Sequence, residues 1–410
     1  MSRTCFAVAL VLIGGLVPTF GQMVWHQATP AAAWPARELH TAVVFQDTLW
    51  VIYGRQGTAT KDVWRSADGA DWTLVSAAPG YRNDHASVVF DNKVWVLGGY
   101  DTGNYKNDVW YSSDGVTWVK LTTGSPMWTP RIGHEAVVFN GKMWVLGGFV
   151  YPGNTGSNDV WYSSDGVNWV LAGNAGWSPR FWHAAVVHNG KIWVMAGYDG
   201  TDRNDVWCSS DGVNWTQVTA AANWTPRHLS TLVSFDNKLW LMGGYRDPSH
   251  NNEVWYSSDG ENWTQATTGV PMWEARQAHV SVVHDGKIWV MGGQRGHNNF
   301  LNDVWYSTGL TALEEPGSSG AAPGGVFVLS PNPATSGSVT LKIQGIKESR
   351  SSAVNVRVFD ASGRCIISYQ PAAANWELGT KLDLRKVPAG VYLARVDVDS
   401  RSATQKLVVR

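Results

Sequence analysis

The sequence predicts an all-β protein: a six-bladed β-propeller closed by its N-terminal strand, followed by a small immunoglobulin-like β-sandwich. Three observations predict this fold. A unit of about 45 to 49 residues recurs six times, starting at positions from Arg37 to Arg276. Each unit carries signals for four short strands. The last unit stops before its fourth strand, whereas the N-terminal region supplies an unmatched one.

Composition limits the classes of function. The 410 residues carry 32 Lys and Arg against 33 Asp and Glu, for a net charge of −1. This balance supplies no broad basic field for nucleic acid or an anionic membrane surface, so neither is expected as a partner. The 43 Gly indicate many tight turns, and the 25 Trp require a repeated structural cause. A chain of this length predicts more than one domain.

The expected division is a signal peptide at 1–21, the propeller at 22–308, a linker at 309–325 and the sandwich at 326–410. Arg3 gives the signal peptide its positive start, Cys5–Val17 its apolar core, and Thr19-Phe20-Gly21 its small residues before cleavage. This apolar run is short for a membrane span, and no second one follows. Removing it leaves Cys208 and Cys365 in different domains, which makes a disulfide between them unexpected.

The third copy shows how one unit yields four strands, called a to d from first to last. Asn140-Gly141 and Asp165-Gly166 are strong hairpin signals between alternating apolar segments. The predicted strands cover residues 134–139, 143–147, 159–163 and 169–171. Four antiparallel strands in a repeat of this length are typical of a propeller blade.

Tryptophan positions indicate how the blades pack and how the ring closes. Strands b, c and d each carry a recurring Trp, and packing between blades is enough to explain them. The sixth copy ends at Thr308 without a strand d, while the segment from Trp25 to Arg37 matches the strand-d segment of the other copies. We therefore expect the N-terminal strand to complete the last blade, with Trp25 beside Trp305. Such closure leaves no free sheet edge between the first and last blades.

These repeats resemble the kelch family across roughly residues 23–308. The matching features are the Arg-x-x-His start, the Gly-Gly doublet that ends strand b, and the Trp of strand d. The resemblance implies a kelch-type propeller of the galactose oxidase-like superfamily. Three positions depart from the pattern: Tyr53 and Ala196 replace the first Gly of a doublet, and Ser230 replaces the His of the fifth copy.

The C-terminal region resembles the type A sorting domain of the bacterial type IX secretion system. The resemblance rests on Ser330-Pro331-Asn332-Pro333, on Asp360 with Gly363-Arg364, and on Pro388–Tyr392. It implies export by a Bacteroidetes-type bacterium, a partnership with the type IX machinery, and release or attachment at the outer cell surface. A sugar- or matrix-binding sandwich is the alternative for this module.

Recurrence separates structural residues from candidate ligand contacts. The Arg-x-x-His pairs would form either a cationic ring at the channel mouth or a repeated hydrogen-bond clip, and their periodicity favours the clip. The recurring Asp before strand c is predicted to cap a turn. A metal site built from the motif histidines is not expected, because equivalent residues of different blades lie too far apart to converge on one ion. Asp199, Asp202 and Asp205 give only a weak calcium signal, since they lack a defined loop spacing, and no metal or cofactor is predicted.

The b–c and d–a loops share one face of a propeller, and in this chain they carry aromatic residues among scattered polar groups. An aromatic ring offers a flat surface to the C–H face of a sugar, and polar neighbours bind its hydroxyls. We expect this face to bind a glycan or an extracellular protein without catalysis, although the loop Trp residues could instead fold onto the blades. The candidate ligand-binding residues are Trp128, Trp177, Trp182, Trp224, Trp273, Arg131, Arg180 and His228.

An enzymatic alternative remains open. A carbohydrate-active enzyme such as a sialic acid epimerase (mutarotase) needs an acid/base carboxylate, and Glu38, Asp84 and Glu135 interrupt the repeat pattern. Such an enzyme predicts one deep central pocket with a carboxyl group of raised pKa. A glycan-binding protein predicts a shallow aromatic face, and an interaction scaffold predicts a broad flat patch.

Overall fold

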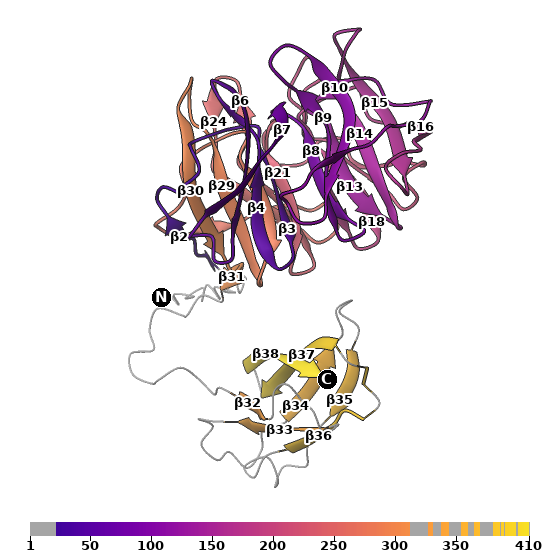
Figure 1. Ribbon diagram of the computed structural model, residues 1–410. Helices are drawn as coiled ribbons and strands as arrows, with labels where there is room; N and C mark the ends of the chain where they lie inside the picture. The colour runs from indigo at the N-terminus through magenta and orange to yellow at the C-terminus, as the bar shows by residue number, and fades with distance from the viewer. Residues whose placement is uncertain are drawn as a thin grey trace, which may run out of the picture. The chain divides into compact units, whose positions relative to one another are not determined.

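The computed structural model describes residues 22–311 and the segments 327–330, 338–343, 354–359, 365–369, 380–385, 387–388, 390–398 and 401–409. In these ranges the regular structure consists of strands (Figure 1). The predicted signal peptide and residues 312–325 of the predicted linker lie outside them. The chain separates into two compact units, Met1–Leu313 and Glu314–Arg410. Within the described ranges, no helix is long and apolar enough to cross a membrane.

The first unit is a propeller of six blades, each with four antiparallel strands in the order a to d. The blades and their strands follow in chain order. Blade 1 holds β3 (Thr41–Phe45), β4 (Thr48–Ile52), β6 (Thr58–Ser66) and β7 (Thr73–Arg82); blade 2 holds β8 (Ala86–Phe90), β9 (Lys93–Tyr100), β10 (Tyr105–Ser112) and β11 (Val119–Lys120); blade 3 holds β13 (Glu135–Phe139), β14 (Lys142–Val150), β15 (Thr155–Ser163) and β16 (Val170–Asn174). Blade 4 holds β17 (Ala184–His188), β18 (Lys191–Met195), β19 (Val206–Ser209) and β20 (Thr216–Thr219); blade 5 holds β21 (Thr231–Phe235), β22 (Lys238–Met242), β25 (Val254–Ser257) and β26 (Thr264–Gln265); blade 6 holds β28 (Val280–His284), β29 (Lys287–Gln294), β30 (Phe300–Ser307) and β2 (His26–Thr29). Short strands lie in the connecting loops: β5 (Arg55–Gln56), β12 (Arg131–Ile132), β23 (Tyr245–Arg246) and β24 (Ser249–His250).

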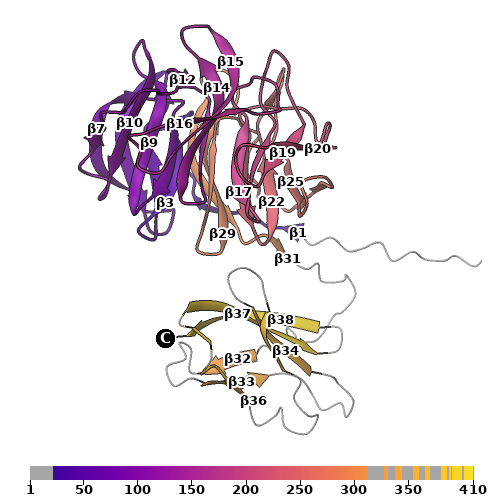
Figure 2. The same ribbon diagram turned by 90° about the vertical axis from the view of Figure 1, so that its right-hand side faces the viewer.

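The N-terminal strand closes the ring, as the sequence predicts. Strand β2 pairs with β30 of the last blade and places Gln27 opposite Trp305. The preceding residue pair, β1 (Gln22–Met23), lies between β27 (Thr267–Thr268) and β31 (Leu310–Thr311), and Figure 2 shows β1 beside β31. Trp25 is fully buried in one cluster with Trp305. The prediction that these two residues lie together is confirmed.

Each Asp-Gly turn after strand c in blades 1 to 5 docks on the preceding blade. In blade 3, the Asp165 carboxylate accepts hydrogen bonds from the N–H groups of Val167 and Asn168, which holds the turn. Gly166 has φ +75°, and a Cβ there would lie 2.3 Å from the ring of Trp95 in blade 2. The glycine is therefore required twice, for the left-handed backbone and for the close approach of the indole. The equivalent contact of Gly69 is with Trp289, across the closure in blade 6.

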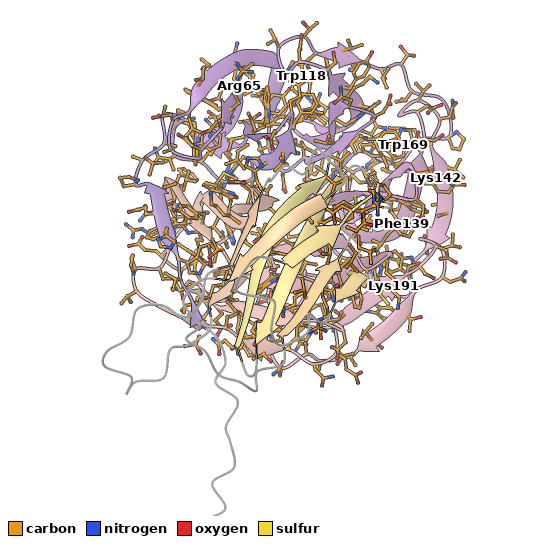
Figure 3. All side chains as sticks on the ribbon, turned by 90° about the horizontal axis from the view of Figure 1, so that it is seen from below. Arg65, Trp118, Phe139, Lys142, Trp169 and Lys191 are labelled. Atoms are coloured by element: carbon orange, nitrogen blue, oxygen red, sulfur yellow. The ribbon has the colours of Figure 1, made fainter. Side chains whose placement is uncertain are left out.

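Tryptophans directly before strand d pack against tryptophans of the d–a loop. In five blades they meet edge to face, with ring centroids 5.8 to 6.1 Å apart. This arrangement adds a favourable quadrupole interaction to the burial of apolar surface. Figure 3, seen from below, shows Arg65, Trp118 and Trp169 following one another around the circle of blades. The pairs are Trp34–Trp72, Trp128–Trp169, Trp177–Trp215, Trp224–Trp263 and Trp25–Trp273.

A buried ion pair fastens the start of each blade. Arg131 is fully buried, and its guanidinium donates to both Asp159 oxygens at 2.7 Å and to the Gly147 carbonyl oxygen at 2.7 Å. Its equivalents in the other blades each pair with the acidic residue at the matching position, which lies within strand c or directly before it. The predicted turn-capping role of this Asp is therefore incorrect, because the carboxylate is the acceptor of an ion pair. The pairs are Arg37–Asp62, Arg82–Asp108, Arg131–Asp159, Arg180–Asp205, Arg227–Glu253 and Arg276–Asp303.

The histidines of the Arg-x-x-His motif join neighbouring blades. His134 is buried, and burial lowers its pKa to about 3, so the ring is neutral and its Nε2–H donates to the Leu97 carbonyl oxygen of blade 2 at 3.1 Å. With the arginines paired and the histidines neutral, these motifs form no cationic ring. His85 and His279 contact Thr41 and Thr231 of the preceding blade in the same way, whereas the ring nitrogens of His40 and His183 have no hydrogen-bond partner among the described residues. The hydrogen-bond clip is therefore present in three of the five motifs.

Two departures from the repeat pattern occupy matching positions in neighbouring blades. In four blades the first Gly of the doublet lies against the His of the next blade: a Cβ on Gly147, for example, would be 3.1 Å from the His183 ring. Ala196 takes this glycine position in blade 4, and blade 5 has the smaller Ser230 where the His would stand. The methyl group of Ala196 therefore occurs at the one blade interface where the facing residue is Ser230 instead of the larger His.

The second unit contains two sheets in its described segments. One has the order β32 (Phe327–Ser330), β33 (Ser338–Ile343), β36 (Thr380–Asp383). The other has the order β35 (Cys365–Tyr369), β34 (Val354–Phe359), β37 (Gly390–Val398), β38 (Arg401–Val409). The immunoglobulin-like assignment stays a prediction.

Candidate ligand-binding site

A closed circle of backbone hydrogen bonds surrounds the central axis of the propeller. Each blade contributes one residue to this circle, the one directly before the motif His; in blade 5 it is the residue directly before Ser230. We call these six residues the belt. Each N–H donates to the belt carbonyl oxygen of the preceding blade at 2.8 to 3.3 Å. All six have φ between 51° and 58°, which turns their N–H and C=O groups along the circle. The belt consists of Leu39, Asp84, Gly133, Trp182, Leu229 and Ala278.

A second circle, the rim, lies on the side of the b–c and d–a loops. In each blade, the residue after the motif Arg pairs with the residue after the doublet. Blades 2 to 5 supply at least one aromatic ring to each pair, whereas blades 6 and 1 supply amide and charged groups. The rim pairs are Glu38–Arg55, Asn83–Tyr100, Ile132–Phe149, Phe181–Tyr198, His228–Tyr245 and Gln277–Gln294.

Rim and belt enclose a cavity of about 540 Å³, mainly over blades 1 to 3. A channel of about 230 Å³ lies on the other side of the belt, between the innermost strands. Asp84 and Trp182 line both spaces, so the belt forms the floor of the cavity. Tyr105, at the start of β10, and the loop residue Tyr151 form part of the cavity wall, with their ring centroids 5.3 Å apart in a stacked arrangement.

Trp182 is held in one orientation on this floor. Its Nε1–H lies 3.2 Å from each carboxylate oxygen of Asp84, two blades away. Its ring stacks on His228 at 5.4 Å with an interplanar angle of 19°, and the ring of Phe181 approaches it edge to face at 4.7 Å. His228 is itself fixed by the Asp202 carboxylate, 2.6 Å from Nδ1. These contacts preorganise an aromatic surface at the centre of the site.

Three carboxyl groups gather around the axis, and each has a raised pKa. Burial raises the pKa of Asp84 to about 6, helped by the charge of Glu38 and opposed by the Trp182 N–H. Burial, with the nearby charge of Asp84, raises the pKa of Glu135 to about 8. Burial also raises the pKa of Glu38, although Arg55 pairs with its carboxylate and opposes the shift. Glu135 lies in the channel and accepts no hydrogen bond from the described part of the chain.

The predicted catalytic candidates are thus brought together, but most predicted binding residues are not. Trp182 lines the cavity and the channel, and His228 lines an adjoining space of about 370 Å³. Arg131 and Arg180 are buried in their ion pairs, and the four loop tryptophans are at most 1% exposed within the blades. Their burial argues against contact with a ligand, because the indole faces are covered by other side chains. The residues concerned are Trp128, Trp177, Trp224 and Trp273.

Sequence reasoning missed Arg55, Tyr105 and Gln294. Arg55 and Gln294 directly follow the doublet, at the position where the other four copies have Tyr or Phe. That recurring position was the signal for the rim. Tyr105 lies beyond a b–c loop of variable length, where the repeat alignment gives no equivalent position. Among the described residues, no group of three or more His, Cys, Asp or Glu side chains could hold a metal ion.

Comparison with known families agrees with this architecture. The model of the KLHDC2/KLHL20/DRC7 Kelch-repeats domain matches residues 19–169, 66–221 and 169–309, which together cover more than half of the chain. The chain therefore belongs to the Kelch-repeat family. A secretion system C-terminal sorting domain matches residues 329–410. The protein is thus a Kelch propeller exported by a type IX system, to the cell surface or beyond it.

A solved structure titled "Structure of YjhT" has the same fold, with a TM-score of 0.56 and 18% sequence identity. The match covers 68% of this chain and 96% of that one. At this level of identity the likeness establishes the fold alone. No curated protein matches the chain.

Proposed function

We propose that the propeller is an exported saccharide-binding protein and that the cavity above the belt holds the sugar. The observation that carries this proposal is the asymmetry of the rim. In the cavity lining, aromatic side chains of blades 2 to 4 face polar groups of blades 6 and 1; they are Tyr100, Tyr105, Tyr151 and Trp182 on one side and Glu38, Arg55, Gln277 and Gln294 on the other. A pyranose has apolar C–H faces and hydroxyl edges, so it needs both kinds of surface at once. A flat scaffold surface would lack such a recess.

The charges around the cavity indicate which sugars fit. Glu38 and Asp84 supply two carboxyl groups to the cavity lining, and Arg55, the guanidinium of the same lining, already pairs with Glu38. A carboxylate on the ligand would meet like charges without an unpaired cation nearby. Neutral sugars or amino sugars are therefore favoured over acidic ones.

Binding can be tested with a glycan array followed by titration calorimetry of the full chain. Tyr151→Ala removes a cavity-wall ring that is 49% exposed, so we expect weaker binding with unchanged folding. Tyr81→Ala is the matched control, because Tyr81 is 45% exposed and lies outside the cavity lining. Equal affinities for both variants and the parent protein would count against this site.

Mutarotation of a sugar is the second candidate function. Ring opening needs a group that both donates and accepts a proton near neutral pH, and the Asp84 carboxyl on the cavity floor has a pKa of about 6. The geometry favours a neutral aldose over sialic acid as substrate, for the charge reason given above. Exchange between anomers of glucose or galactose, followed by NMR, tests this activity. Asp84→Asn should abolish any rate above the uncatalysed one; no rate above it in the parent protein removes the candidate.

A further inference from the structure

The recess above the belt has two compartments. The first is the 540 Å³ cavity, mainly over blades 1 to 3, and a second of about 370 Å³ lies mainly over blades 5 and 6. Each falls within the range of about 300–1,000 Å³ that is typical of small-molecule sites. Both are lined by the same five side chains, so they adjoin one another. The shared residues are Arg55, Trp182, Leu229, Gln277 and Gln294.

The compartments differ in chemistry. The first joins the tyrosines Tyr105 and Tyr151 to the Asp84 carboxyl group. The second joins Tyr245 to the imidazoles of His228 and His250, with no carboxyl group among the described residues that line it. Each compartment therefore has its own aromatic ring and its own polar groups. Apart from the five shared side chains, each compartment has binding groups that the other lacks.

The boundary between the compartments is rigid and can still form hydrogen bonds. Trp182 is fixed by Asp84 and His228, as described above. Arg55 donates through Nε and Nη2 to Glu38, while its Nη1 donates to no group in the described part of the chain. Gln277 Nε2 donates to Gln294 Oε1 at 3.3 Å, which orients both amides. A ligand crossing this boundary would meet an indole and an available guanidinium N–H.

We propose that the ligand is a saccharide of at least two units, with one ring in each compartment and the glycosidic linkage over Trp182 and Arg55. This inference rests on the proposed saccharide binding and adds the length of the ligand. A monosaccharide would leave one aromatic compartment filled only with water. Linking two rings lets the second bind without a further loss of translational freedom, so affinity should increase from one unit to two.

The test is calorimetric titration of the full chain with monomer-to-tetramer series of glucose (α1,4 and β1,4), mannose (α1,6) and N-acetylglucosamine (β1,4). In the series that binds, we expect at least about tenfold tighter binding of the dimer than of the monomer, with one site per chain. Tyr151→Ala and Tyr245→Ala should each weaken dimer binding, and only one of them should weaken monomer binding. Tyr81→Ala should change neither.

Two outcomes would overturn the two-compartment inference but leave saccharide binding intact. The first is equal affinity for monomer and dimer. The second is that Tyr151→Ala and Tyr245→Ala both weaken monomer and dimer binding to the same extent. Absence of binding in every series and on the array would overturn the proposed function, and the inference with it. Thermal unfolding of each variant shows whether a loss of binding reflects a loss of folding.

Discussion

The backbone N–H of Leu39 donates a hydrogen bond to the carbonyl oxygen of Ala278 at 3.2 Å, which joins the first blade to the last. This bond completes the belt. Because the belt residues bond to each other, their backbone amides are not available to a ligand. Recognition at the cavity floor must therefore come from side chains, and of these Asp84 and Trp182 are the polar and aromatic members.

Closure by the N-terminal strand predicts a large loss of stability when Trp25 is truncated. Trp25 is fully buried and meets Trp273 edge to face at 5.8 Å. Trp25→Ala should lower the free energy of unfolding by about 3–5 kcal/mol. Urea denaturation followed by fluorescence measures the change. Gln27→Ala, at an exposed position of the neighbouring strand β2, is the control and should cost less than about 0.5 kcal/mol.

The docking of turn glycines on the preceding blade predicts a difference between two Gly→Ala variants. Gly141 and Gly166 have similar φ, +69° and +75°, but a Cβ meets nothing within 4 Å at Gly141 and the Trp95 ring at Gly166. Gly141→Ala should cost only backbone strain, about 1–2 kcal/mol. Gly166→Ala should cost roughly 1–3 kcal/mol more, because the indole must move. Equal midpoints in urea would contradict the docking.

The paired departures at Ala196 and Ser230 predict coupling between the two positions. Ser230→His alone should destabilise the protein by roughly 1–3 kcal/mol, because the imidazole meets the Ala196 methyl group. Adding Ala196→Gly should recover most of this loss, since a glycine with φ near +61° makes room without strain. A double-mutant cycle measures the coupling, and additive effects would show that the two sites are independent.

The Glu135 carboxyl group predicts a pH-dependent effect on stability. Its pKa is raised from 4.5 to about 8, so the folded protein keeps a proton that the unfolded chain releases between these values. The stability contributed by the group therefore falls as pH rises from about 4.5 to 8. We compare the free energy of unfolding of Glu135→Gln with that of the parent protein at two pH values. The difference in favour of the variant should be larger at about pH 8.5 than at about pH 4.5 by at least about 1.4 kcal/mol, the equivalent of one pKa unit.

Chemical denaturation at the two pH values checks this expectation. The exposed Glu261→Gln change is the control and should show little difference between them. An equal effect of Glu135→Gln at both pH values would show that folding does not raise the pKa of this carboxyl group.

The sequence was sufficient for the architecture because blade-building residues recur. The motif Arg and the strand tryptophans appear in register in the six copies, the doublet departs in only two of them, and the incomplete last copy indicated the closure. The site was harder to predict, because the residues between the motif Arg and His alternate between rim and belt. His228 belongs to the rim and Trp182 to the belt, although both stand between the same landmarks. A one-residue offset changes where the side chain points, and periodicity does not reveal it.

The loop tryptophans illustrate the opposite error. Trp128 and Trp182 have the same chemistry and both lie in d–a loops, so residue type alone suggested one role for both. Only Trp128 recurs at its position in other repeats, and the structure buries it. The lack of recurrence at Trp182 was therefore the better guide to the cavity.

Closure by β2 also constrains the order in which the chain can finish folding. Ala32 and Asn302 are hydrogen-bonded partners that stand 270 positions apart. If the chain leaves a pore with its N-terminus first, strand β2 has no partner until almost the whole propeller has followed. The last blade can form only when both β2 and β30 have left the pore. A chain that stops partway through translocation would therefore expose an unpaired sheet edge.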